Sequence, residues 1–413
     1  MKAKRILSSV VAVLTAASML VGCSSGSSTA ASGSTAASGS TSDSGFEPMT
    51  IAIGTNAVNE DFTNMQKAYD EVIGPALNIK FIYSEQLTDA GALTTFIENS
   101  YAAGADAVMT NLSNAIDQGA AVCEDLGLYY VGISSAGSAE NSSLSHYVSV
   151  AGASAEGYGD SYANVIQAIV GDGEEHSILI LSGAAAYGAT SFIEGTAGSL
   201  RALQDVYGLT YTEDINTLAT SATQIDAEND KGVKITIFPG MEDLATNVSP
   251  LLQTGDYDVL VGTTDIYSSL GVAVNEVEEA LGMDIKFINR AAFSDSMETA
   301  FNSTDSQGSP IMDGIVVNGT YENVASIIML RNAFDGYAEN MRDNGQCSRV
   351  PGMSPLAITS TDDYNLLSGD DIPYSFMTTE DILSLCGPDV TWQDIDEFGA
   401  NLTTENLVAK FAQ

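Results

Sequence analysis

The stretch AGADAVMTNLSNAIDQGAAVCEDLGLYYVGISS, residues 103–135, contains one complete strand–helix–strand unit. Its first part, 105–113, is an apolar run that ends on small polar residues, as a buried strand does. Residues 115–127 carry apolar side chains at helical spacing and stop at Gly127, a common residue just after a helix. Residues 128–135 form a second β-rich run. This succession indicates a parallel βαβ unit.

The same rhythm runs through most of the 413-residue chain and restarts after residue 152. Strands are predicted at 49–55, 78–85, 105–113, 128–135, 147–152, 177–183, 234–240, 258–265, 284–290 and 312–319. We therefore predict an α/β fold of two doubly wound parallel-sheet lobes, joined by a multi-strand hinge and followed by a C-terminal helical segment. The expected division is a signal peptide at 1–22, a tether at 23–46, an N-terminal lobe at 47–150, a C-terminal lobe at 151–318, a return helix at 319–352, and a third hinge crossing with an extension at 353–413.

The chain begins like an exported protein. A basic start is followed by a mostly apolar run at 6–21, which is short for a membrane span and typical of a secretory signal. Residues 20–23, LVGC, resemble the lipobox of bacterial lipoproteins, which implies that Cys23 carries lipid such as palmitate and anchors the protein to the outer face of the cell membrane. Ordinary signal cleavage, with Cys23 incidental, is the alternative. Residues 24–45 are nearly all Ser, Gly, Ala and Thr and form a flexible tether.

Composition narrows the function further. Fourteen Lys and Arg against 54 Asp and Glu give a net charge of −40, which argues against binding to nucleic acid or to an anionic lipid surface. Of the four cysteines, Cys347 and Cys386 could form a disulfide in an exported chain or stay as thiols. The two histidines and the cysteine spacing fit no zinc pattern, so neither a metal nor a cofactor is expected.

Two stretches resemble the type I periplasmic binding proteins, the ribose- and galactose-binding family of ABC-importer receptors. One is residues 103–135, and the other is 257–290, YDVLVGTTDIYSSLGVAVNEVEEALGMDIKFINR, which has Thr264-Asp265 where the family usually has Asn-Asp. The resemblance covers about residues 49–340. It implies a monomeric, non-enzymatic receptor that captures a small polar, carbohydrate-like solute between two lobes and delivers it to an ABC permease.

Side chains at the predicted strand ends are the candidates for ligand contact, because open parallel sheets bind ligands beyond the carboxyl ends of their strands. They are Asn56, Glu85, Asn111, Ser135, Tyr187, Glu242, Asp265, Tyr267, Arg290 and Asn318. The resemblance implies a ligand-facing carboxylate at Asp265 and an amide at Asn318. Structural roles are open for several: Asp265 can cap the next helix and Asn111 can be a turn residue. Tyr187 and Tyr267 can be packing residues, and Arg290 can pair with Asp265 or Asp295.

Two departures from the family bear on the ligand. Sugar binders of this family usually carry an arginine after the fourth strand and another after the first strand of the second lobe, where this chain reads ISSAGS (133–138) and GAAAYGAT (183–190). A simple pentose or hexose is therefore less expected, and a less polar solute, a nucleoside-like or modified glycan, or a small amine suits the residues at least as well. The tail after 342 also far exceeds the usual closing strand. Its three stretches at 378–387, 391–400 and 403–412 are predicted to be short helices capped by threonine.

Other classes of function remain. The alternative is that a two-lobed receptor of this kind signals the presence of its ligand to a membrane signalling protein instead of delivering it to a permease. An exported enzyme is disfavoured because the chain has no G-x-S-x-G, no H-E-x-x-H and no Cys–His constellation. A carboxylate pair such as Glu85 and Asp265 is the one arrangement left for acid–base chemistry.

The anchor can be tested by replacing Cys23 with alanine. The Cys23→Ala protein should move from the membrane pellet to the soluble exported fraction, because without the acyl chains nothing holds it to the bilayer. Fractionation after a salt wash measures this. Retention of the variant in the pellet would contradict lipidation at Cys23.

Overall fold

The structure is a computed structural model, which describes residues 45–133, 141–171, 176–305 and 308–412. These residues belong to one compact unit, Ser42–Gln413. Cys23 and Ser135 lie outside the described residues. Within the described residues, no helix is long and apolar enough to cross a membrane.

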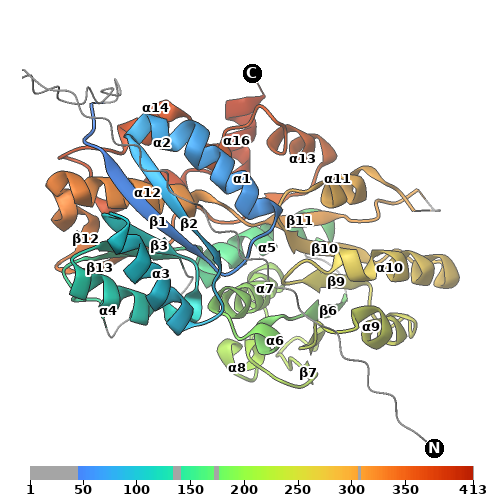
Figure 1. Ribbon diagram of the computed structural model, residues 1–413. Helices are drawn as coiled ribbons and strands as arrows, with labels where there is room; N and C mark the ends of the chain where they lie inside the picture. Colours follow the sequence, from blue (N-terminus) through green and yellow to red (C-terminus); the bar gives the residue numbers. More distant parts are fainter. Residues whose placement is uncertain (1–44, 134–140, 172–175, 306–307, 413) are drawn as a thin grey trace, which may run out of the picture. The chain divides into compact units, whose positions relative to one another are not determined.

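The first sheet is built mainly from the N-terminal part of the chain (Figure 1). Its strands lie in the order β12-β13-β5-β4-β3-β1-β2, all parallel except β12, which is antiparallel to β13. Their bounds are β1 Met49–Thr55, β2 Ile79–Gln86, β3 Ala107–Thr110, β4 Tyr129–Ile133, β5 Tyr147–Ala151, β12 Arg342–Asp343 and β13 Gln346–Val350.

The second sheet repeats this arrangement with later segments. Its order is β14-β11-β10-β9-β6-β8-β7, with β14 and β7 antiparallel to their neighbours. The bounds are β6 Ser177–Leu181, β7 Ile225–Asp226, β8 Lys234–Phe238, β9 Val259–Gly262, β10 Lys286–Ala291, β11 Gly314–Val317 and β14 Leu356–Ile358. Strands β1 to β5 in the first sheet, and β6, β8, β9, β10 and β11 in the second, have the 2-1-3-4-5 order of doubly wound folds. The predicted fold class is confirmed, and most observed strands are shorter than predicted.

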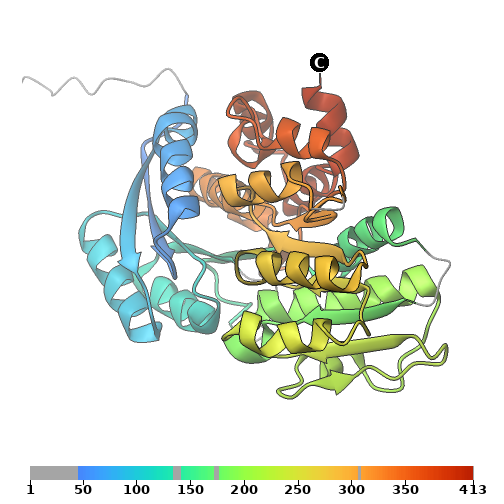
Figure 2. The same cartoon turned by 90° about the vertical axis from the view of Figure 1, so that its right-hand side faces the viewer.

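Helices cover both faces of each sheet (Figures 1 and 2). In the first lobe, α1 (Glu60–Ala68) and α12 (Tyr321–Asn332) pack on one face, and α3 (Ala90–Ala102) and α4 (Ile116–Leu126) on the other. In the second lobe, α5 (Ala155–Ile169) and α7 (Thr190–Tyr207) lie opposite α9 (Leu244–Leu252) and α10 (Tyr267–Leu281). The other α-helices before the tail are α2 Gly74–Leu77, α6 Ala184–Tyr187, α8 Ile215–Ala219 and α11 Asp295–Asn302. π-Helical turns lie at Tyr69–Ile73 and Ala333–Tyr337, and short 3-10 turns at Ser113–Ala115 and Ala338–Met341.

Three segments cross between the lobes. β5 in the first sheet leads into α5, which packs against the second sheet at β11 and β14. β11 in the second sheet leads into α12, which packs against β4 and β5 of the first sheet. β13 and β14 belong to different sheets, so the chain crosses a third time at 351–355. The crossings bring residues after β5 and β11 to the junction of the lobes.

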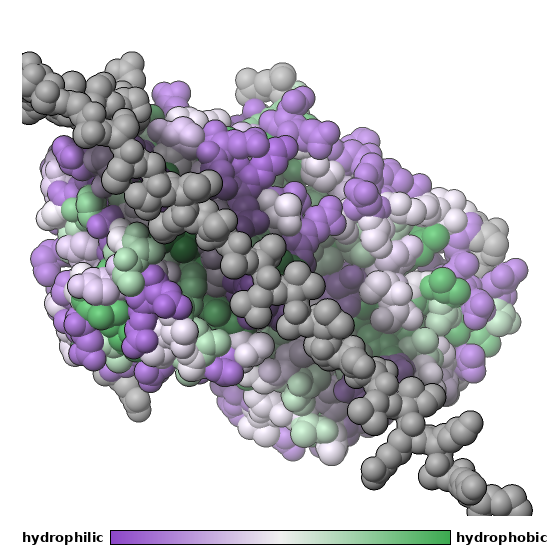
Figure 3. All heavy atoms as spheres, viewed as in Figure 1, coloured by the Kyte–Doolittle hydropathy of each residue, from purple (hydrophilic) through white to green (hydrophobic). Residues whose placement is uncertain are grey.

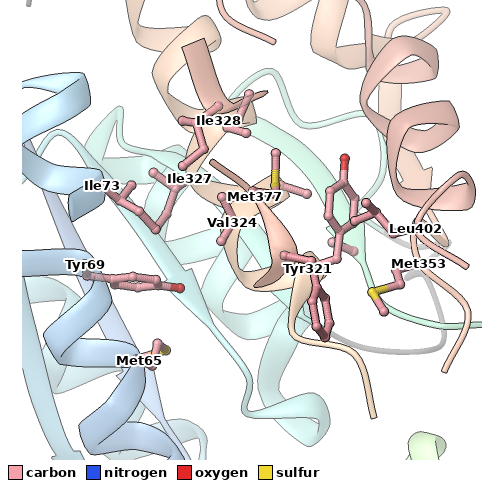
Figure 4. Packing of buried hydrophobic residues seen from close by; sticks show 14 of the residues in the cluster. Met65, Tyr69, Ile73, Tyr321, Val324, Ile327, Ile328, Met353, Met377 and Leu402 are labelled. Carbon is pink, nitrogen blue, oxygen red and sulfur yellow. The ribbon is translucent and has the colours of Figure 1, made fainter. Parts of the chain in front are cut away.

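The C-terminal extension contains α13 (Thr361–Leu367), α14 (Thr379–Ser384), α15 (Trp392–Ala400) and α16 (Thr404–Phe411). The last three begin as predicted, because Thr378, Thr391 and Thr403 each accept a hydrogen bond from a first-turn N–H. Met377 and Leu402 are buried with Tyr321 of α12 in one cluster (Figure 4). The extension therefore forms part of the hydrophobic core of the first lobe.

The Cys347–Cys386 disulfide that the sequence allowed is not formed, since all three described cysteines are free thiols. The two side chains pack in different hydrophobic clusters, Cys347 with α3 and α4 and Cys386 with the extension. The Cys386 thiol donates to the carbonyl of Ile382, 3.5 Å away.

The surface of the molecule, on the face drawn in Figure 3, mixes hydrophilic residues with scattered apolar ones.

Candidate functional site

Two neighbouring cavities lie at the carboxyl ends of the strands, where the lobes meet. The first compartment has a volume of about 350 Å³ and draws residues from both sheets and from two crossings. It is lined by Asn56, Asn111, Ser113, Ile133, Gly152, Ala153, Tyr158, Ala189, Ser191, Phe192, Arg290, Asn318, Gly319 and Glu322. The second compartment, of about 500 Å³, shares Asn56, Asn111, Asn318 and Gly319 with the first. Both compartments therefore belong to one interlobe cleft.

Arg290 is the buried cation of the first compartment, with only 5% of its surface exposed. Nη1 donates to the carbonyls of Ser191 and Thr263, at 3.1 and 3.0 Å. Nη2 donates to the hydroxyl of Tyr158 at 2.7 Å, and the guanidinium lies 4.3 Å from the centre of that ring. These contacts satisfy a charge that would be costly to bury alone. Arg290 pairs with neither Asp265 nor Asp295, because its partners are carbonyls, a phenol and an amide.

Asn318 is oriented by the same arginine. Its Oδ1 accepts a hydrogen bond of 2.7 Å from Nε of Arg290. Because Nε–H can only donate, the oxygen must face the arginine, and the Nδ2 group points elsewhere. Nδ2 has no acceptor among the described residues, and Asn318 lines both compartments. Asn318 therefore offers two N–H donors to the cleft.

Asn56 and Asn111 form the opposite wall, in the loops after β1 and β3. These loops diverge at the point where the strand order reverses, which is where doubly wound sheets bind ligands. Oδ1 of Asn111 accepts from the backbone N–H of Asn56 at 2.8 Å. That bond fixes the Asn111 amide, so its Nδ2 faces away from the Asn56 backbone.

Glu322 adds a carboxyl group from the first turn of α12. Burial raises its pKa to about 7, although its own backbone N–H and the charges of Arg349 and Arg290 oppose the shift. Near neutral pH this group can therefore donate or accept a hydrogen bond. No cluster of three or more metal-ligating side chains is present among the residues that the structure describes. The first compartment thus offers amides, one carboxyl and one cation to a polar solute.

Comparison with solved structures identifies the architecture. A crystal structure of an ABC transporter periplasmic solute-binding protein from Actinobacillus succinogenes 130z with bound D-allose matches with a TM-score of 0.52 at 14% identity, covering 77% of this chain and 99% of that chain. This is the fold of the type I periplasmic solute-binding proteins. An ABC transporter solute-binding protein from Bacillus halodurans C-125 with bound myo-inositol gives a TM-score of 0.49 at 15% identity, covering 78% and 97%. No protein-family model and no curated protein matches the sequence.

Within this solute-binding-protein fold, the cleft brings together four of the predicted residues, Asn56, Asn111, Arg290 and Asn318. Five others line neither compartment, namely Glu85, Tyr187, Glu242, Asp265 and Tyr267. Asp265 is exposed, and its Oδ1 accepts from the N–H of Tyr267 and from Nδ2 of Asn289, at 3.1 and 3.0 Å. Asp265 thus bonds the first N–H of α10, whose N-cap position is Ile266. Ser135 lies outside the described residues.

The other four residues that were predicted to line the cleft from strand ends line neither compartment. Tyr187 is 56% exposed and packs on Phe192, with 4.6 Å between the ring centres. Tyr267 packs against the cluster under α10. Glu85 and Glu242 are exposed. Three lining residues were not predicted from the sequence: Tyr158, Phe192 and Glu322, which occupy early turns of helices. The one available signal for Tyr158 and Glu322 was their position, since α5 and α12 each follow a lobe crossing.

The position of Arg290 depends on Gly195 of α7, because a Cβ there would overlap Nη1 of the arginine. We expect Gly195→Ala to lower the free energy of unfolding by about 1–3 kcal/mol, as overpacked sites do. Gly159→Ala on α5 is the matched control, since a Cβ there meets its nearest atom at 3.5 Å, an ordinary contact. Urea denaturation compares the two. Equal stability of both variants would contradict the tight fit at Arg290.

The raised pKa of Glu322 predicts a pH effect. The folded protein holds this proton up to about pH 7, whereas the unfolded chain releases it near 4.5, the ordinary pKa of a glutamate side chain. Stability should therefore fall as pH rises between these values. Glu322→Gln should match the parent at pH 5 and exceed its unfolding free energy by about 1–3 kcal/mol at pH 8.

Thermal denaturation at both pH values measures this effect. Glu278, whose pKa is also raised to about 7, stays in both proteins and leaves a common background. The same difference between variant and parent at pH 5 and pH 8 would show that Glu322 titrates normally.

Proposed function

We propose that this chain is a lipid-anchored extracytoplasmic solute-binding protein, which captures a small polar, carbohydrate-like solute in the first compartment. The observation that carries the proposal is the group formed by Arg290, Asn318 and Glu322 between the two lobes. Asn318 Nδ2 supplies hydrogen-bond donors to a cavity of about 350 Å³. The carboxyl of Glu322 lines the same cavity and can donate or accept according to its protonation state. Ligand pockets commonly begin near 300 Å³.

The chemistry of the lining favours a hydroxylated solute. Hydroxyl groups both donate and accept, so they can satisfy amides and a carboxyl at the same time. Phe192 and Ile133 supply apolar surface, against which the C–H face of a sugar ring can pack. Arginines are absent from the two positions where sugar binders of this family usually carry them, and Arg290, which lines the cavity from β10, orients Asn318.

Delivery to an ABC permease completes the proposal. Closure of two lobes around a solute removes it from water and produces a distinct shape that a membrane partner can recognise. Cys23 and the Ser/Gly/Ala-rich segment after it would hold the receptor near that partner.

Thermal shift over pentoses, hexoses, inositols, nucleosides and small amines tests the function. A ligand at 100 times its Kd should add about 2.7 kcal/mol to the unfolding free energy. Calorimetry with the best solute should then show about tenfold weaker binding to Asn318→Ala, which loses its donors and the bond to Arg290.

Asn114→Ala is the matched control, because Asn114 is exposed and lines neither compartment. Unchanged affinity of Asn318→Ala, or a pattern in which both variants lose affinity equally, would contradict binding in the first compartment. Stabilisation by nucleosides or amines alone would replace the carbohydrate-like class and leave the binding site in place.

A further inference from the structure

The second compartment differs in chemistry from the first. Its walls include the rings of Phe62, Phe293, Tyr374 and Phe376, together with Met65. Among the described residues that line it, Asp61 is the only charged one. The lining also contains six asparagines, two threonines and two serines. Because aromatic rings offer a large apolar area for contact, four rings beside uncharged polar groups favour a neutral ligand with an apolar ring over an anion.

One wall of this compartment comes from the C-terminal extension, between α13 and α14. Leu367, Ile372, Pro373 and the Tyr374–Phe376 turn all line it. This turn is bonded to the start of α12: Ser375 Oγ donates to the Thr320 carbonyl at 2.8 Å, and Asn323 Nδ2 donates to the Tyr374 hydroxyl at 3.0 Å. The wall is therefore fixed to the same crossing that carries Asn318 and Glu322.

The backbone of this wall is unusual. Ser375 and Phe376 both have positive φ angles, 58° and 61°, in the left-handed region that non-glycine residues seldom adopt. Such residues gather at ligand-binding sites, where the surrounding structure maintains them. Here the conformation brings the largely buried Phe376 to the cavity lining.

The two compartments meet at shared asparagines. Asn56, Asn111 and Asn318 line both cavities, so one ligand can contact them from either side. A solute whose polar ring fills the first compartment would direct a substituent past these amides into the second.

We propose that the second compartment binds an uncharged apolar ring attached to the polar solute, and that the C-terminal extension supplies this specificity. The proposal rests on the proposed function of the first compartment. The ligand class is then an aryl-substituted or similarly amphipathic glycoside rather than a free monosaccharide.

Matched methyl and phenyl hexosides, in both anomers, test the proposal by calorimetry with the full mature chain. The phenyl compound of the preferred sugar should bind about tenfold more tightly, because its ring is removed from water. Asn64→Trp and Ser368→Trp, which fill the compartment from α1 and from the extension, should abolish this gain and leave methyl hexoside binding unchanged. Thr63→Trp and Asp362→Trp, at exposed neighbouring positions outside the lining, should keep it.

The outcomes separate the two proposals. Equal binding of methyl and phenyl hexosides would overturn the second site and leave the first intact. A phenyl gain that survives Asn64→Trp and Ser368→Trp would place the ring elsewhere and overturn the assignment too. No binding of any hexoside would reject hexosides as the solute and overturn this inference, and the wider thermal-shift panel then decides whether the carbohydrate-like function holds.

Discussion

Arg290 is a cation buried at the carboxyl end of β10, and the arrangement of the cleft follows from the need to satisfy it. Its donors reach the carbonyls of Thr263, just after β9, and of Ser191 in α7, the phenol of Tyr158 on α5 and the amide of Asn318 at a lobe crossing. An unpaired charge there would be strongly destabilising. The arginine therefore ties two strands, two helices and one crossing together. Most N–H donors of Arg290 bond to other protein atoms, so Arg290 orients neighbouring side chains, above all that of Asn318.

The crossing after β11 connects this network to the rest of the molecule. Asn318 faces the first compartment, Glu322 begins α12 on the same side, and the Thr320 carbonyl accepts a bond from Ser375 in the extension. A hinge segment usually has few partners, since it must absorb the rotation of the lobes. Here it carries cleft-facing groups and also supports the wall of the second compartment. In the proposed function, solute recognition and the extension thus depend on one short stretch of backbone.

Strand-end position predicted part of this arrangement from sequence alone. The apolar runs predicted the parallel strands of both sheets, because such strands are buried on both faces and have continuous hydrophobic sequences. Asn56, Asn111, Arg290 and Asn318 were found because each lies at or just after the carboxyl end of a strand. Asp265 occupies an equivalent place, yet its carboxylate binds Asn289 and the start of α10. A strand end fixes the edge of the sheet but not the direction of the side chain. Glu322 and Tyr158 depend on how helices pack, and the Ser375–Phe376 wall depends on a tertiary contact with α12.

A crystal structure of the protein with its best-binding solute is the decisive experiment for binding in the first compartment. We expect density for the solute there, with contacts to Nδ2 of Asn318 and the carboxyl of Glu322 and with residues of both lobes around it. Arg290 should keep its bonds to Ser191 and Thr263 in that complex. A solute bound to one lobe alone, or outside the compartment lined by Asn318 and Glu322, would rule out this binding mode.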